Sequence, residues 1–152
     1  MVGILIVSHG NLAEALISSV QILVGNLQNV RGVSIWPQEG KEEIQDRIER
    51  EMAEVDGGDG VIILTDLLGG TPTNLSLSFL HEERVAVVTG VNIPMLLALF
   101  SYQKEKSLEE IGRLVKKAGR KSITLVSTGK NQKGSQKWMR WYPRFATNGW
   151  KQ

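Results

Sequence analysis

Short runs of consecutive apolar residues, many of them β-branched, recur along the chain. Unbroken runs of this kind are typical of parallel strands that are covered on both faces. The runs predict five strands, over residues 2–8, 30–36, 61–65, 84–89 and 121–127.

Between these runs, apolar residues recur every three or four positions on polar segments, which predicts amphipathic helices. The two clearest stripes are Leu12, Leu16, Val20 and Leu23, and then Ile44, Ile48, Met52 and Val55. Further helices are expected after Thr71, Pro94 and Ser107. The alternation of strands and helices predicts an α/β fold, with a doubly wound, mainly parallel sheet and flanking helices.

Residues with capping chemistry stand where three of these helices should begin. We expect Asn11 to cap the first helix, with Glu14 reaching back to it. Thr71 is expected to cap the helix that Pro72 opens, because proline is preset for the first helical position. The segment Ser107–Glu110 has the pattern of a capping box.

The composition allows a well-packed core, with 41% hydrophobic residues. No apolar run reaches the roughly 18 residues of a membrane span. The apolar N-terminus lacks the basic start of a signal peptide, and His9 interrupts it. The chain has no cysteine, which excludes disulfides and thiolate metal sites and suits a reducing compartment. A cytoplasmic location is therefore expected.

The net charge of +2 is divided unevenly along the chain. Residues 130–152 contain six basic residues and no acid, whereas residues 1–129 carry a net charge of −4. We therefore expect one domain over 1–129 and a basic, aromatic tail of unassigned role over 130–152. Basic residues interleaved with aromatic ones can bind nucleic acids or membranes, but a divergent, loosely packed tail is the plainer interpretation.

Three loops follow predicted strands and hold most of the candidate chemistry. They are Ser8-His9-Gly10, Asp66–Asn74 and Thr89–Ile93. In an open parallel sheet, ligands bind beyond the carboxyl ends of the strands. If the first strand is central, these loops converge.

His9 and Asp66 are the titratable residues of the first two loops. A histidine at a strand end is more often structural, and an aspartate there commonly binds turn amides. Asp66 could instead accept a hydrogen bond from Nδ1–H of His9, which would fix the tautomer and expose the lone pair of Nε2. The residues alone leave both interpretations open.

Gly69, Gly70 and Thr71 form a second candidate feature. Two glycines allow the backbone to approach a ligand, and the helix N-terminus that follows offers unpaired N–H groups. The hydroxyl of Thr71 can add a donor. Helix starts near one histidine would favour a doubly charged anion such as a phosphoryl group. An ordinary tight turn is the alternative.

The usual motifs of other chemistries are missing from the sequence. There is no G-x-x-x-x-G-K-[ST] loop, no G-x-G-x-x-G after a strand, no G-x-S-x-G elbow and no metal-ligand spacing of histidines and carboxylates. We therefore expect neither a cofactor nor a metal.

Three segments together resemble the site loops of the mannose-family enzyme IIA domain of the bacterial sugar phosphotransferase system. They are Ile-Val-Ser-His9-Gly, Asp66-Leu-Leu-Gly-Gly-Thr-Pro-Thr-Asn74 and Gly90-Val-Asn-Ile-Pro-Met-Leu96. All three occur in order at predicted strand ends, and the resemblance covers about residues 1–128.

This resemblance implies a phosphoryl carrier for sugar uptake. His9 would be phosphorylated on Nε2 with Asp66 as its hydrogen-bond partner, and the phosphoryl group would be held by Gly10, Gly69, Gly70 and Thr71. The donor would be the phosphocarrier protein HPr and the acceptor a separate enzyme IIB. No nucleic acid is implied, and membrane contact would come only through the IIC/IID transporter. Family members are homodimers that exchange the last, antiparallel strand, here residues 121–127.

Other functions remain open at the level of sequence. The phosphotransfer subunit of a dihydroxyacetone kinase resembles the family around Ser8-His9, although it lacks the Gly-Gly-Thr-Pro-x-Asn segment. A small-molecule binding domain of flavodoxin-like fold would prefer a hydroxyl-rich first loop for flavin, and a regulatory module is a third candidate. The apolar residues Leu67, Leu68, Ile93 and Met95 are expected to form a rim that excludes water or docks partners, or else to belong to the core.

Overall fold

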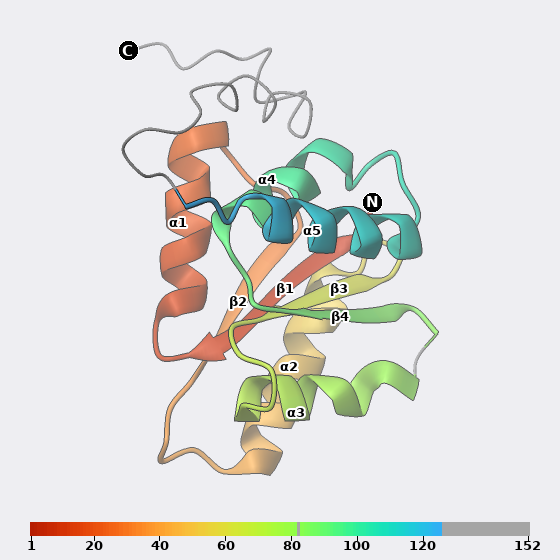
Figure 1. Ribbon diagram of the computed structural model, residues 1–152. Helices are drawn as coiled ribbons and strands as arrows, with labels where there is room; N and C mark the ends of the chain where they lie inside the picture. Colours follow the sequence, from red (N-terminus) through yellow and green to blue (C-terminus); the bar gives the residue numbers. More distant parts are fainter. Residues whose placement is uncertain (82, 126–152) are drawn as a thin grey trace.

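The computed structural model describes residues 1–81 and 83–125 of the chain (Figure 1). These residues contain a four-stranded sheet in the order β2-β1-β3-β4, with every pairing parallel. The strands are β1 (Gly3–His9), β2 (Val30–Ile35), β3 (Val61–Thr65) and β4 (Val85–Thr89). The strand order reverses at β1, so the carboxyl ends of β1 and β3 form the topological switch point where ligands bind in such sheets.

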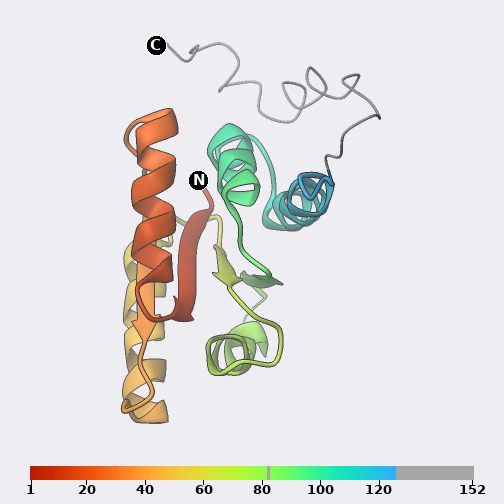
Figure 2. The same ribbon diagram turned by 60° about the vertical axis from the view of Figure 1, so that its left-hand side comes forward.

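Helices cover both faces of the sheet, which confirms the doubly wound α/β prediction. They are α1 (Leu12–Val24), α2 (Lys41–Val55), α3 (Thr71–Leu77), α4 (Ile93–Tyr102) and α5 (Leu108–Lys121), with a short 3₁₀ turn η1 (Ser78–His81) after α3. Figures 1 and 2 both show α5 and α3 on opposite sides of β4.

Alternation along the buried strands divides the core into two layers. Ile4 and Ile6 of β1 pack with residues of α1, α4 and α5 on one face. Leu5 and Val7 pack with residues of α2 and α3 on the other face. Because both faces are covered, the strand is apolar at successive positions, as the sequence pattern predicted.

The prediction of a fifth strand over residues 121–127 is wrong at Lys121, which belongs to a helix. Lys121 is the last residue of α5, and residues 122–125 form no strand within this single chain. Residues 126 and 127 and the tail over 130–152 lie outside the described residues. The domain boundary at residue 129 and the exchange of a strand in a dimer stay predictions.

Two of the three predicted caps also differ from the structure. The side chain of Asn11 makes no capping hydrogen bond; instead, the hydroxyl of the buried Ser8 accepts from the amide of Ala13 at 2.9 Å. Glu14 accepts from Ser34 Oγ of β2 at 2.5 Å instead of reaching back. Ser8 serves as the cap because it stands near the carboxyl end of β1, just before α1 begins.

Helix α3 is capped one residue earlier than predicted. Gly70 occupies the N-cap position, so Thr71 is the first helical residue and its exposed side chain is not a cap. Pro72 is therefore the second helical residue, one position later than expected, although it still lies in the first turn. The capping box between Ser107 and Glu110 is confirmed.

Candidate functional site

His9 is the last residue of the central strand β1, at the switch point of the sheet. Its backbone lies in register with Ile35 of β2, and Gly10 donates a hydrogen bond to the carbonyl of Ile35 at 2.9 Å. The preceding residue, Ser8, is fully buried, whereas the side chain of His9 is 51% exposed. The backbone of His9 is therefore fixed by the sheet while its ring faces outward.

Asp66 follows β3 directly and binds His9 through one carboxylate oxygen. Oδ2 of Asp66 accepts a hydrogen bond from the backbone amide of His9 at 2.8 Å and lies 2.8 Å from Nδ1 of the ring. Since an ionised carboxylate can only accept, Nδ1 carries the ring proton. The lone pair of a neutral imidazole is then on Nε2, the ring nitrogen that Asp66 does not contact.

The charge state of Asp66 follows from this contact. Burial raises the pKa of the Asp66 carboxyl, but the hydrogen bonds from the His9 amide and imidazole outweigh burial and hold the pKa below its ordinary value. Asp66 is therefore a carboxylate at neutral pH. Its negative charge stabilises positive charge on the imidazole.

Gly70 brings the loop after β3 against the ring of His9. A Cβ atom on Gly70 would lie 2.9 Å from Cε1 and 3.6 Å from Nε2 of His9. Only glycine permits this approach, because real Cβ atoms do not come so close to other heavy atoms. Gly69 supports the same turn with a φ of 85°, a left-handed conformation that favours glycine. The first turn of α3, which opens with Thr71, therefore begins beside the imidazole.

A buried threonine that sequence reasoning missed holds this loop in shape. Thr73 is fully buried, and its hydroxyl donates to the carbonyl of Leu67 at 2.6 Å. Its oxygen also lies 2.6 Å from Oγ1 of Thr65, which must be the donor there because Thr73 has one proton to give. The sequence signal that could have revealed Thr73 is a small polar residue on the buried side of a predicted helix.

The loop after β4, the third of the predicted site loops, supports the loop after β3. The amide of Val91 donates to the carbonyl of Thr65 at 2.9 Å, which joins the loop after β4 to the end of β3. Asn92 caps α4 by accepting from the amide of Met95 at 3.2 Å. These hydrogen bonds give the loop a structural role, and they assign none of its residues to a ligand.

The apolar rim predicted around the site is half right. Leu67 and Leu68 are exposed, at 60% and 73%. Met95 is buried in the core and Ile93 packs against it, so both belong to the core, one of the readings left open by the sequence. The sequence analysis missed Trp36, whose exposed indole lies beside Gly10.

The family of this chain is decided by comparison with known proteins. The family model EIIA-man, described as "PTS system fructose IIA component", matches residues 3–116. The chain belongs to this IIA family. The resemblance inferred from the site loops is thereby confirmed.

Individual IIA proteins show the same similarity. The chain is 32% identical to the "PTS system mannose-specific EIIAB component" of Escherichia coli K12 over 80% of its own length and 38% of that protein, so it spans about two fifths of that relative. It is 28% identical to the "PTS system fructose-specific EIIA component" of Bacillus subtilis, over 84% of this chain and 88% of the relative. A solved PTS IIA protein associated with the fucose utilization operon of Streptococcus pneumoniae is 38% identical, with a TM-score of 0.71, over 81% of this chain and 91% of that one.

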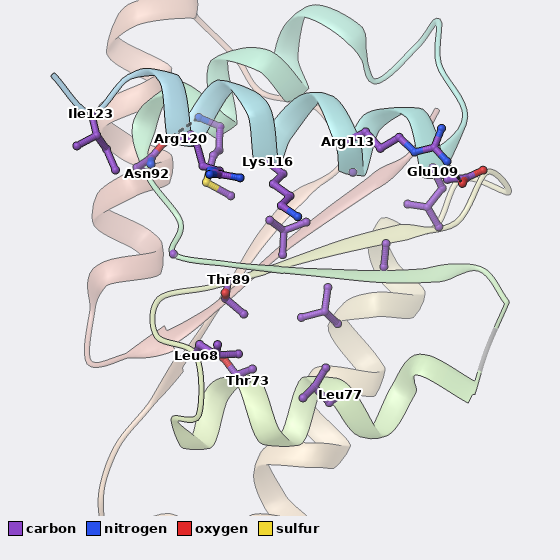
Figure 3. A pocket seen from close by; sticks show the side chains of 18 residues that line it. Leu68, Thr73, Leu77, Thr89, Asn92, Glu109, Arg113, Lys116, Arg120 and Ile123 are labelled. Atoms are coloured by element: carbon purple, nitrogen blue, oxygen red, sulfur yellow. Dashed lines mark hydrogen bonds and ion pairs between the residues drawn. The ribbon is translucent and has the colours of Figure 1, made fainter.

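A groove of about 750 Å³ runs along the outer edge of β4 in this IIA domain, between α3 and α5 (Figure 3). Leu68 lines one end, which places that end beside the loop after β3. The α5 side carries basic side chains, and Figure 3 shows Lys116 pointing from α5 toward β4. Within the described residues, no strand pairs with this edge of β4.

The described part of the IIA domain offers neither a membrane span nor a metal-binding cluster. Over residues 1–81 and 83–125, every helix is too short or too polar to cross a bilayer. In the same ranges, histidine and acidic side chains do not gather in the groups of three that could hold a metal ion. The side chain of the second histidine, His81, lies outside the described set.

Proposed function

We propose that this IIA domain is a phosphoryl carrier that accepts phosphate on Nε2 of His9 and passes it on. The donor is phospho-HPr, and the acceptor is a separate enzyme IIB of a sugar uptake system. The observation that carries the proposal is the half-exposed imidazole whose Nδ1 is held at 2.8 Å by the carboxylate of Asp66.

The reaction is an in-line exchange of one nitrogen–phosphorus bond for another. The lone pair of Nε2 attacks phosphorus while the bond to the donor's imidazole nitrogen breaks and its electron pair returns to that nitrogen. The transition state is loose, so catalysis consists mainly of positioning and charge stabilisation. Asp66 performs both tasks, because it orients the ring and balances the charge that His9 gains.

The phosphoryl oxygens would meet donors from the loop after β3. Gly70 lies against the ring, so a group on Nε2 would stand beside the start of α3. The first turn of a helix has backbone N–H groups without intrahelical partners, and the hydroxyl of Thr71 adds one more donor. Gly10 and Gly69 let the two loops approach the group closely. Transfer to enzyme IIB runs by the same steps in the other direction.

We also propose that the protein works in the cytoplasm as a homodimer. The dimer would exchange residues 122–127, the part of the predicted strand that follows α5, along the outer edge of β4. Ile123 and Leu125 support this idea, because they are 80% and 92% exposed and alternate as in a strand with one buried face. The apolar floor of the groove would receive them.

Reconstitution tests the carrier function. The purified protein is incubated with enzyme I, HPr and labelled phosphoenolpyruvate, and then with enzyme IIB. We expect an acid-labile, alkali-stable label on the protein that enzyme IIB removes, and no label on the variant His9→Ala. Full labelling of His9→Ala would disprove the site, and an unlabelled wild-type protein would disprove the function.

A further inference from the structure

Trp36 is a half-exposed aromatic residue at the edge of the proposed site. It follows Ile35, the β2 residue that lies opposite His9 in the sheet register. Atoms Cζ3 and Cη2 of its indole lie 3.8 Å from the position that a Cβ atom on Gly10 would occupy. The side chain is nevertheless 51% exposed, so a large part of the indole faces solvent next to the reacting histidine.

A set of charged contacts holds the backbone that carries this indole. The amide of Trp36 donates to Oε2 of Glu39 at 2.6 Å, and Oε1 of Glu39 lies 2.7 Å from the guanidinium of Arg47. Arg47 also donates to the carbonyl of Ser34 at 2.8 Å. These contacts fix both sides of Trp36, so the side chain is presented by an ordered turn. Ordering an exposed aromatic residue in advance reduces the entropy that a partner must overcome on binding.

Other exposed apolar side chains follow the carboxyl ends of strands β1 and β3. Leu67 and Leu68 follow Asp66, and Leu12 opens α1 just after the His9 loop; their exposures are 60%, 73% and 41%. We call Leu12, Trp36, Leu67 and Leu68 the site patch. Each member comes from a segment that contacts or adjoins His9, so a body that covers the imidazole must cover part of the patch.

We propose that the site patch is the docking surface for the phosphohistidine-bearing protein that donates to His9, with Trp36 as its anchor. This inference rests on the proposed function. A protein donor must bring its own imidazole to the phosphorus that Nε2 attacks, so its surface necessarily meets the residues around His9. Tryptophan is enriched among the few residues that dominate protein interfaces, and exposed leucines around it exclude water. A small phosphoryl donor would make few of these contacts.

The test compares a protein donor with a small one on the full chain. Phospho-HPr is the protein donor, and phosphoramidate, which phosphorylates imidazole directly, is the small donor. For Trp36→Ala we expect the KM for phospho-HPr to rise at least about tenfold with little change in kcat. The rate with phosphoramidate should fall far less. The ratio of the rate with phospho-HPr to the rate with phosphoramidate should therefore drop about tenfold. Trp36→Phe should restore most of the ratio.

Two further variants guard against a folding artefact. Leu67→Ser changes a side chain that is 60% exposed and does not line the groove along β4, and it should shift the ratio in the same direction by a smaller factor. Ile22→Ala removes an 81% exposed apolar side chain of α1 that is outside the site patch, and it should leave the ratio at the wild-type value.

The outcomes separate the docking role from its alternatives. Equal losses with both donors in Trp36→Ala would show that Trp36 positions the His9 loop, and they would overturn the docking role. Wild-type ratios in both Trp36→Ala and Leu67→Ser would overturn it as well. If the wild-type protein accepts phosphate from phosphoramidate but not from phospho-HPr, the proposed donor fails first, and the docking inference falls with it.

Discussion

Asp66 contacts His9 at two atoms, the backbone nitrogen and the ring nitrogen Nδ1. A single carboxylate oxygen of Asp66 lies 2.8 Å from the backbone amide of His9 and 2.8 Å from its Nδ1. The first contact ties the end of β1 to the loop after β3, and the second sets the orientation and tautomer of the ring. The position of the His9 backbone and the orientation of its ring therefore both depend on the ionised carboxylate of Asp66.

Replacement of Asp66 by asparagine should slow phosphoryl transfer while the fold stays intact. The amide side chain keeps the shape but removes the charge that stabilises the imidazole, so we expect a rate about 10²-fold lower. The rate of labelling by phospho-HPr measures this effect. Asp46→Asn, an exposed acid of α2, is the matched control and should behave as wild type. Normal transfer by Asp66→Asn would remove Asp66 from the mechanism.

The same pair predicts a pH dependence of stability. Because the folded-state pKa of Asp66 lies below its ordinary value, ionised Asp66 stabilises the fold at pH values above that ordinary pKa of about 3.9. This contribution is lost as the pH falls through the lower folded-state pKa. The free energy of unfolding should therefore differ between wild type and Asp66→Asn at pH 7, and the difference should shrink toward pH 3. A difference that grows on acidification would contradict the assignment.

A methyl group at Gly70 should displace the imidazole. The added Cβ would lie 2.9 Å from Cε1 of His9, so either the ring or the loop must move. We expect Gly70→Ala to lower the transfer rate at least tenfold, since the position of the nucleophile sets much of the rate. Gly112→Ala makes the same chemical change in α5, where nothing lies within 4 Å, and should transfer normally. Equal rates for the two variants would show that Gly70 does not position the ring.

Substitutions at Thr71 and Thr73 should have different effects. The change at Thr73 should lower the stability of the fold, and the change at Thr71 should slow phosphoryl transfer. Thr73→Val deletes the hydroxyl that links Thr65 and Leu67, and it leaves buried polar groups unpaired at a cost of about 1–3 kcal/mol. Thr71→Val changes an exposed first-turn residue, so the free energy of unfolding should hardly change while phosphoryl transfer slows. Urea unfolding and labelling rates on both variants check this. A stable Thr73→Val protein, or unaltered transfer by Thr71→Val, would contradict these roles.

The sequence was sufficient for most of the fold because two signals agree along it. Continuous apolar runs place all four described strands, and apolar residues at helical spacing place the helices between them. The approach of His9 to Asp66 follows from topology, since His9 ends β1 and Asp66 directly follows β3, its parallel neighbour. These inferences needed only local patterns and the rule for parallel sheets.

Other features depended on side-chain packing that a local pattern does not encode. Ser8 took the capping role expected of Asn11 because its hydroxyl already points toward the first turn of α1. Thr73 is buried between two elements, and Trp36 meets Gly10 across β2 and β1. Residues 122–125 carry a strand-like pattern, but no strand forms within the single chain.

The proposed mechanism requires that Nδ1 of His9 holds a proton and that Nε2 takes the phosphoryl group. Nitrogen-15 NMR of the imidazole side chains, recorded before and after phosphorylation by phospho-HPr, observes both atoms directly. We predict a protonated Nδ1 before the reaction and phosphorus coupling to Nε2 of His9 afterwards, with the signals of His81 unchanged. Phosphorus on Nδ1 of His9, or on His81, would contradict the account.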